Sequence, residues 1–119
     1  MSRKKYCLFC FTQTLLALLL GATIYVFFWL EATNPAWIRF FLPDALWSYA
    51  LCFALAGVWG NTVKSLILVS ILDAGWGIFW ETLQHFHLVP GTGDFWDVFV
   101  YIVAMLLAIC VLYNLKVEE

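Results

Sequence analysis

Polar side chains that could do chemistry gather late in this chain, between long runs of apolar residues. Asp73, Glu81 and His85 are separated by multiples of four, and a step of four drifts only about 40° around a helix. Gln84 follows Glu81 by three positions and joins the same flank. A polar stripe of this kind on a helix in lipid faces a partner or water, because charged groups avoid lipid tails.

Two further acids, Asp94 and Asp97, lie on either side of the start of the last apolar segment. Asp94 is well placed to cap a helix, and Asp97 then falls in its first turn, where the helix dipole favours a negative charge. Asp97 can also face Glu81 across the short loop, and two such carboxylates could share a proton or a cation. The sequence leaves both interpretations of Asp97 open.

Asp73 is the one acid deep inside an apolar segment. It comes about ten residues after Val63, or about 15 Å along a helix, which places it near mid-membrane. An ionised Asp there costs on the order of 2.5–3.5 kcal/mol, so we expect it to face the bundle interior, in its protonated form. Two roles are open: a structural acid hydrogen-bonded to another helix, or an acid linked to protons or substrate.

Metal binding is not expected. His85 and His87 form an H-x-H pair that lacks the dense ligand spacing of a zinc motif. Cys7 and Cys10 form a single C-x-x-C without a second ligand pair. We therefore predict neither a metal nor a cofactor.

The elements that must position these residues are transmembrane helices. The chain is 65% hydrophobic and 12% charged, whereas a soluble domain is about 45–50% apolar and about 25% charged. Crossing the hydrocarbon core takes about 20 helical residues. Pro43 and Asp44 suit the first turn of a helix. The sequence predicts an all-α membrane protein, one domain over residues 1–119, with four transmembrane helices at approximately residues 6–30, 44–60, 63–84 and 95–115.

Short turns between these segments predict an up-down-up-down bundle of antiparallel neighbours. Glycines at four positions would allow close helix approach: Gly57, Gly60, Gly75 and Gly77. Most of the basic residues fall on one side of such a bundle, namely Arg3, Lys4, Lys5, Lys64 and Lys116. The positive-inside rule then places both termini in the cytoplasm and the polar cluster at the outer leaflet.

The stretch GIFWETLQHFHLVPGTGDFWDVF combines E-x-x-Q at a helix end, a Pro-Gly turn and an Asp opening the next helix. In this it resembles the VanZ-like family of small bacterial four-helix membrane proteins, named for a glycopeptide-antibiotic resistance determinant. The segment LPDALWSYAL is also similar, so the resemblance spans most of the chain. It marks Glu81, Gln84 and Asp97 as site residues. It implies a bacterial cytoplasmic (inner) membrane protein of the cell envelope, with antibiotic resistance as the associated process.

Three functions follow as hypotheses. In the first, the outer-leaflet site engages a membrane lipid, a lipid-linked envelope precursor or glycan, or an amphiphilic antibiotic; Glu81 and Asp97 bind or relay protons, and Gln84 orients the ligand. In the second, the chain is a small accessory or scaffold subunit whose polar stripe pairs with another membrane protein or a second copy. The third is an intramembrane acid–base enzyme. The sequence shows no nucleophile beside a base, which counts against covalent catalysis. We prefer the first and expect no nucleic-acid partner.

Overall fold

The structure is a computed structural model that describes residues 1–30, 36–89 and 95–117. In these ranges the chain forms four helices, α1 (Arg3–Leu30), α2 (Ala36–Trp59), α3 (Val63–His85) and α4 (Phe95–Tyr113). Each is long and apolar enough to cross a membrane. The prediction of an all-α chain with four helices of membrane-spanning length and composition is confirmed.

The outer surface of these helices is largely apolar. Leu15, Leu19, Ile71 and Leu107 are each more than half exposed. Contact between such surface and water is unfavourable by about 25 cal/mol per Å², a penalty that lipid tails remove. The surface therefore agrees with a multi-pass membrane protein.

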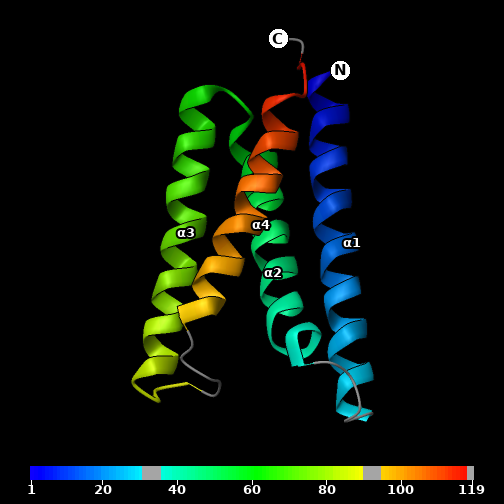
Figure 1. Ribbon diagram of the computed structural model, residues 1–119. Coiled ribbons are helices and arrows are strands. Elements are labelled where there is room, and N and C mark those ends of the chain that lie inside the picture. The colour runs from blue at the N-terminus through cyan, green and yellow to red at the C-terminus, as the bar shows by residue number, and fades with distance from the viewer. Residues whose placement is uncertain (31–35, 90–94, 118–119) are drawn as a thin grey trace.

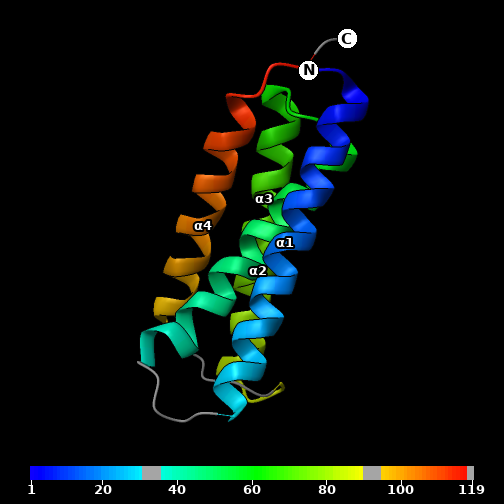
Figure 2. The same cartoon turned by 90° about the vertical axis from the view of Figure 1, so that its right-hand side faces the viewer.

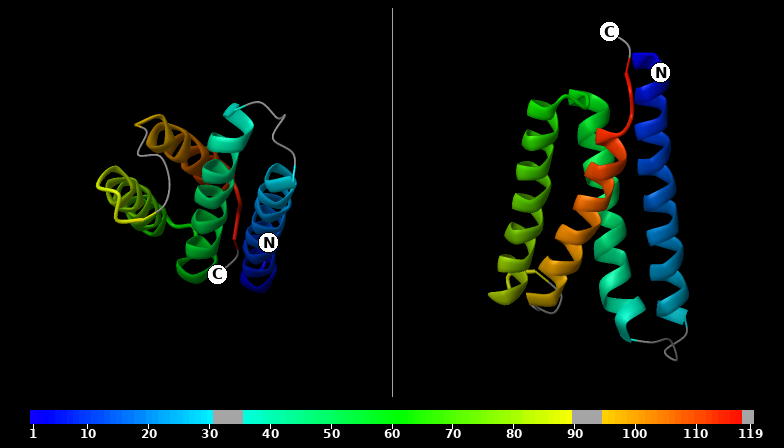
Figure 3. Two further views of the ribbon diagram at one scale, coloured as in Figure 1. Left: turned by 90° about the horizontal axis from the view of Figure 1, so that it is seen from below. Right: turned by 45° about the horizontal axis from the view of Figure 1, so that its top comes forward.

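Helix α2 is the central helix of the four. This helix packs against α1, α3 and α4, and α4 also packs against α3. In the part of the chain that the structure describes, the backbone of α1 approaches neither α3 nor α4. Figures 1 and 3 show α1 on one side of α2 and the α3–α4 pair on the other, with the start of α1 and the end of α4 at the same end of the molecule. We call this the terminal end, and the opposite one the loop end.

Helix α2 begins at Ala36 rather than near residue 44, and Pro43 lies inside it. Proline has no N–H and its ring crowds the preceding turn, so a helix that continues through it bends. Figure 2 shows the first turns of α2 at an angle to the rest of the helix. A bent helix can hold a proline in its interior, so Pro43 does not mark the start of α2. The other helix ends lie within a few residues of their predicted positions.

The buried core lies toward the terminal end, where all four helices contribute to it. Its members are Tyr6, Cys10, Cys52, Phe53, Ala56, Leu66, Val69, Met105, Ala108 and Leu112. A Cβ on Gly57 would lie 3.2 Å from the Cβ of Cys10, so this glycine does allow the close approach of α1 and α2. Gly75 differs, because a Cβ there would meet nothing within 4 Å. The predicted role is thus confirmed for Gly57 and wrong for Gly75.

Candidate functional site

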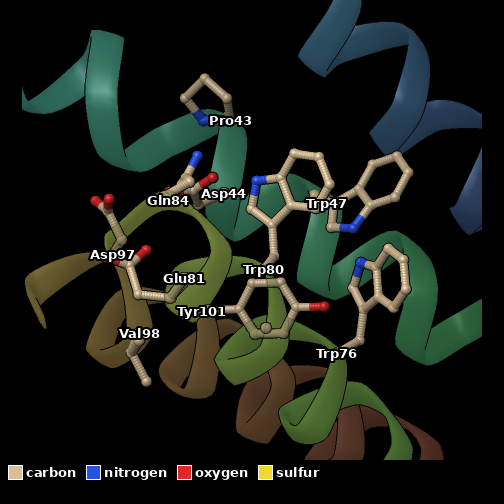
Figure 4. A pocket seen from close by; sticks show the side chains of 11 residues that line it. Pro43, Asp44, Trp47, Trp76, Trp80, Glu81, Gln84, Asp97, Val98 and Tyr101 are labelled. Carbon is tan, nitrogen blue, oxygen red and sulfur yellow. The ribbon is translucent and has the colours of Figure 1, made fainter. Parts of the chain in front are cut away.

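A pocket of about 340 Å³ lies at the loop end, where the bent start of α2, the end of α3 and the start of α4 meet (Figure 4). Most of its walls come from two kinds of side chain, acidic and aromatic. The lining residues are Pro43, Asp44, Trp47, Trp76, Gly77, Trp80, Glu81, Gln84, Asp97, Val98 and Tyr101. In Figure 4 the acids and Gln84 lie toward one side of the pocket and the three indoles toward the other.

The acidic side of the pocket holds Asp44, Glu81 and Asp97. Asp97 is only 8% exposed, and Oε1 of Glu81 and Oδ1 of Asp97 are both buried. Asp44 and Asp97 are close enough for their negative charges to act on each other. The structure thus brings Glu81, Gln84 and Asp97 together from two helices and adds Asp44 from a third. Asp44 was missed because the sequence analysis assigned it to a helix start.

The aromatic side is made by Trp47, Trp76 and Trp80. Trp76 and Trp80 are one helical turn apart on α3, and their rings stack with centroids 6.3 Å apart and planes 25° apart. All three indoles are between two fifths and one half exposed, so they form part of the pocket wall and part of the outer surface. Trp76 and Trp80 are four positions apart and Glu81 follows directly. This pattern is visible in the sequence and could have indicated an aromatic wall beside the acid.

Tyr101 forms the floor of the pocket, and Gly77 makes room for its ring. A Cβ on Gly77 would lie 2.6 Å from Cδ1 of Tyr101, which is closer than packed atoms tolerate. Gly77 was expected to allow close approach of a neighbouring helix. The space beside it is instead filled by an aromatic side chain of α4. The ring of Tyr101 therefore packs directly against the backbone of α3 at Gly77.

Asp73 lies beneath this floor and is fully buried. The Tyr101 hydroxyl donates a hydrogen bond to its Oδ1 at 2.6 Å. The Ser48 hydroxyl lies 3.4 Å from Oδ2 and donates to the main-chain carbonyl of Tyr101 at 2.7 Å. Asp73 therefore faces the protein interior, as predicted, and joins α3 to α2 and α4. It does not line the pocket itself.

The remaining candidates lie elsewhere. His85 is exposed and packs edge-on against the ring of Phe86 at 5.4 Å. His87 has φ 58°, the left-handed conformation that ends many helices. Its N–H donates to the carbonyl of Gln84 at 3.1 Å, so it closes the last turn of α3. Asp94 lies outside the described residues. Among the described residues, no group of three or more His, Cys, Asp or Glu could hold a metal ion.

Comparison with known proteins gives no relative: no protein-family model, no curated protein and no solved structure matches the chain. The chemistry of the pocket is set by its lining. Three carboxylates accept hydrogen bonds, while the Gln84 amide and the indole N–H groups can donate them. The arrangement can therefore bind a group that both donates and accepts hydrogen bonds.

Proposed function

We propose that this chain is a VanZ-like, multi-pass protein of the bacterial cytoplasmic membrane whose pocket binds an amphiphile at the outer leaflet. The ligand is an envelope lipid, a lipid-linked glycan or an amphiphilic antibiotic. The observation that supports this function is one pocket with an acidic side and an aromatic side. Glu81 and Asp97 bind the polar head, Gln84 orients it, and the indoles hold the first part of the apolar chain.

The size and depth of the pocket suit a head group. Its volume of about 340 Å³ falls at the lower end of the roughly 300–1,000 Å³ of small-molecule sites. A whole glycopeptide antibiotic would not fit, although a lipid-like part of one would. Glu81 comes four residues before the end of α3 at His85, a rise of about 6 Å along the helix. That depth corresponds to the head-group layer, which Trp side chains also favour.

The orientation in the membrane is part of this proposal. Arg3, Lys4, Lys5 and Lys64 all belong to the terminal end, and the positive-inside rule puts that end in the cytoplasm. His87, at the loop end, is then outside. A His87→Cys probe in a chain lacking the four native cysteines should react in intact cells with a membrane-impermeant maleimide. Labelling only after the cytoplasmic side is opened would contradict the orientation.

The function is tested by the dependence of Glu81 and Asp97 on each other. If two acids hold one ligand, the effects of their substitutions should not add, because the second acid contributes less to binding once the first is lost. We expect Glu81→Gln and Asp97→Asn each to abolish function, measured as antibiotic sensitivity or envelope integrity in the host, at unchanged membrane expression. The double variant should be no worse than either single one.

Thermal stability in detergent, measured beside the phenotype, separates binding from folding. The charge-preserving Glu81→Asp should keep at least part of the function that Glu81→Gln loses. If the two neutral variants only lower stability, additively and without a phenotype, the acids are structural and the binding function is wrong.

The accessory-subunit hypothesis is less favoured by the geometry. It requires the polar stripe of α3 to face another protein. Asp73 and Gly77 are instead buried, the former bonded to Tyr101 and the latter against its ring, while Glu81 lines the pocket. Copurification of a protein at equal stoichiometry in mild detergent would support that role in place of ligand binding.

A further inference from the structure

We infer that the head group held in the pocket is an organic cation, an ammonium group carried on an apolar chain; this inference rests on the binding function proposed above. The first observation is the charge of the lining. Asp44, Glu81 and Asp97 line one pocket, and none of its described lining residues is Lys, Arg or His. A cation in their midst would be attracted by all three carboxylates of the lining.

The same charge pattern discriminates among the candidate ligands. Carboxylates held in a partly buried site repel one another more strongly than they would in water. A positive head group relieves that repulsion. A phosphate or pyrophosphate adds to it, and the described lining offers no basic side chain to receive it. Ligands that present a phosphate to the pocket are thus disfavoured, and ligands that present an amine are favoured.

The aromatic side is a second observation, independent of the acids. Trp faces attract cations through the ring quadrupole, and groups of aromatic rings are the usual recognition element for quaternary ammonium. Trp47, Trp76 and Trp80 line the pocket together with the Tyr101 ring. The aromatic rings beside the carboxylates therefore point to an organic cation, an ammonium group with attached carbon.

The volume sets the extent of what is enclosed. About 340 Å³ accommodates a trimethylammonium or primary ammonium group and the first few carbons of a chain. The rest of the chain then follows the exposed indoles toward the lipid. Two sources share this chemistry: the amine head group of a membrane lipid and a free cationic amphiphile such as an amphiphilic drug.

The experiment measures binding of decyltrimethylammonium to the full chain in an uncharged maltoside detergent, by calorimetry and by the change in tryptophan fluorescence. Decanol and decyl phosphate carry the same chain with a neutral and an anionic head. We expect the ammonium probe to bind at least tenfold more tightly than either. Asp44→Asn, Glu81→Gln and Asp97→Asn should each weaken it at least tenfold, while Glu81→Asp should change it less than threefold.

A matched pair of variants tests the aromatic side. Trp80→Phe should weaken binding of the ammonium probe severalfold, whereas Trp96→Phe should not, since Trp96 is 61% exposed and is absent from the lining. Phosphatidylethanolamine and phosphatidylglycerol added to the micelles identify the source. Competition by the former alone assigns the site to a lipid amine, and no competition assigns it to a free amphiphile; either result supports an ammonium ligand.

Failure of the inference and failure of the proposed function give different results. If decanol or decyl phosphate binds in the pocket as tightly as the ammonium probe, and the neutral variants bind it as the native chain does, the cationic head group is overturned and the binding function stands. If none of the three probes binds and none changes the fluorescence of a folded chain, the binding function is overturned as well.

Discussion

The terminal end and the loop end of this molecule deal with polar side chains in different ways. At the terminal end the Tyr6 hydroxyl donates to the carbonyl of Ala56 at 3.1 Å. The Asn61 amide donates to the carbonyls of Leu112 at 3.0 Å and Leu115 at 2.7 Å. At the loop end three carboxylates line a pocket instead.

The difference follows from what helix backbones offer in a membrane. A main-chain carbonyl keeps a second lone pair after its helical hydrogen bond, so hydroxyl and amide donors find acceptors on a neighbouring helix. A carboxylate needs donors, and the N–H groups inside a helix are already used. Donor side chains can therefore seal a contact between helices, as Asn61 does. Acids gather where another donor or a cation can reach them.

Asp73 marks the boundary between the two ends. It is the one buried acid of α3, and it has a donor, the hydroxyl of Tyr101. The ring of the same tyrosine is the floor of the pocket. Packing below this floor and binding above it are thus joined through one side chain.

The largest change in stability is expected from Gly77→Ala, which breaks the boundary. The new Cβ would lie 2.6 Å from the Tyr101 ring, so the ring must move and its bond to Asp73 must lengthen. Overpacking and a lost buried hydrogen bond together should lower the free energy of unfolding by about 3 kcal/mol, and ligand binding should fall too. Unfolding in detergent measures the first effect.

Gly75→Ala is the matched control, because a Cβ at Gly75 meets nothing within 4 Å. It should leave stability unchanged or raise it by up to about 1 kcal/mol through helix propensity. Equal stabilities of the Gly75→Ala and Gly77→Ala variants would show that Tyr101 does not occupy the place described.

A smaller change is expected from Asn61→Leu, which opens the terminal end alone. Two carbonyls near the end of α4 lose their donor, at a cost of about 1–2 kcal/mol. Ligand binding should stay within twofold, since the pocket is at the other end. Asn114→Leu removes the same amide from a residue whose bond stays within its own turn, to the Cys110 carbonyl, and should cost less. A parallel loss of binding in Asn61→Leu would mean that the two ends are not independent.

The sequence predicted the helices better than it predicted the pocket. Apolar runs of about 20 residues identify the spans. Steps of four on α3 placed Asp73 in the interior and Glu81 at the pocket, whereas His85, the last member of the same stripe, is exposed. Asp44 was assigned to a helix start, and helix periodicity carries no information on which helices meet, so nothing in the sequence connected it to the acids of α3 and α4. Pro43 led to a wrong start for α2, because both the first turn of a helix and a bend within one accept proline. The position of Tyr101 depends on its contact with Gly77, which the sequence does not reveal.

The smallest change is expected from Asp73→Asn, and it tests how the boundary is satisfied. A serine hydroxyl has one hydrogen, and that of Ser48 goes to the Tyr101 carbonyl at 2.7 Å. Oδ2 of Asp73, 3.4 Å from the Ser48 oxygen, then faces a lone pair of that oxygen, to which a protonated carboxyl can donate its hydrogen. In Asn the NH2 group can take the place of Oδ2 and donate to Ser48, while the amide oxygen takes the place of Oδ1 and accepts from Tyr101. It should therefore reproduce the hydrogen bonds of neutral Asp73.

We therefore expect Asp73→Asn to fold, to change the free energy of unfolding by less than about 1 kcal/mol, and to bind the ligand normally. Asp73→Leu, which leaves the buried Tyr101 hydroxyl without its acceptor, should cost about 1–3 kcal/mol. Loss of binding in a well-folded Asp73→Asn variant would give Asp73 a functional role beyond its bonds to α2 and α4. If Asp73→Asn fails to assemble while Asp73→Glu is tolerated, the network needs a negative charge, and the neutral acid predicted from its depth in the membrane is wrong.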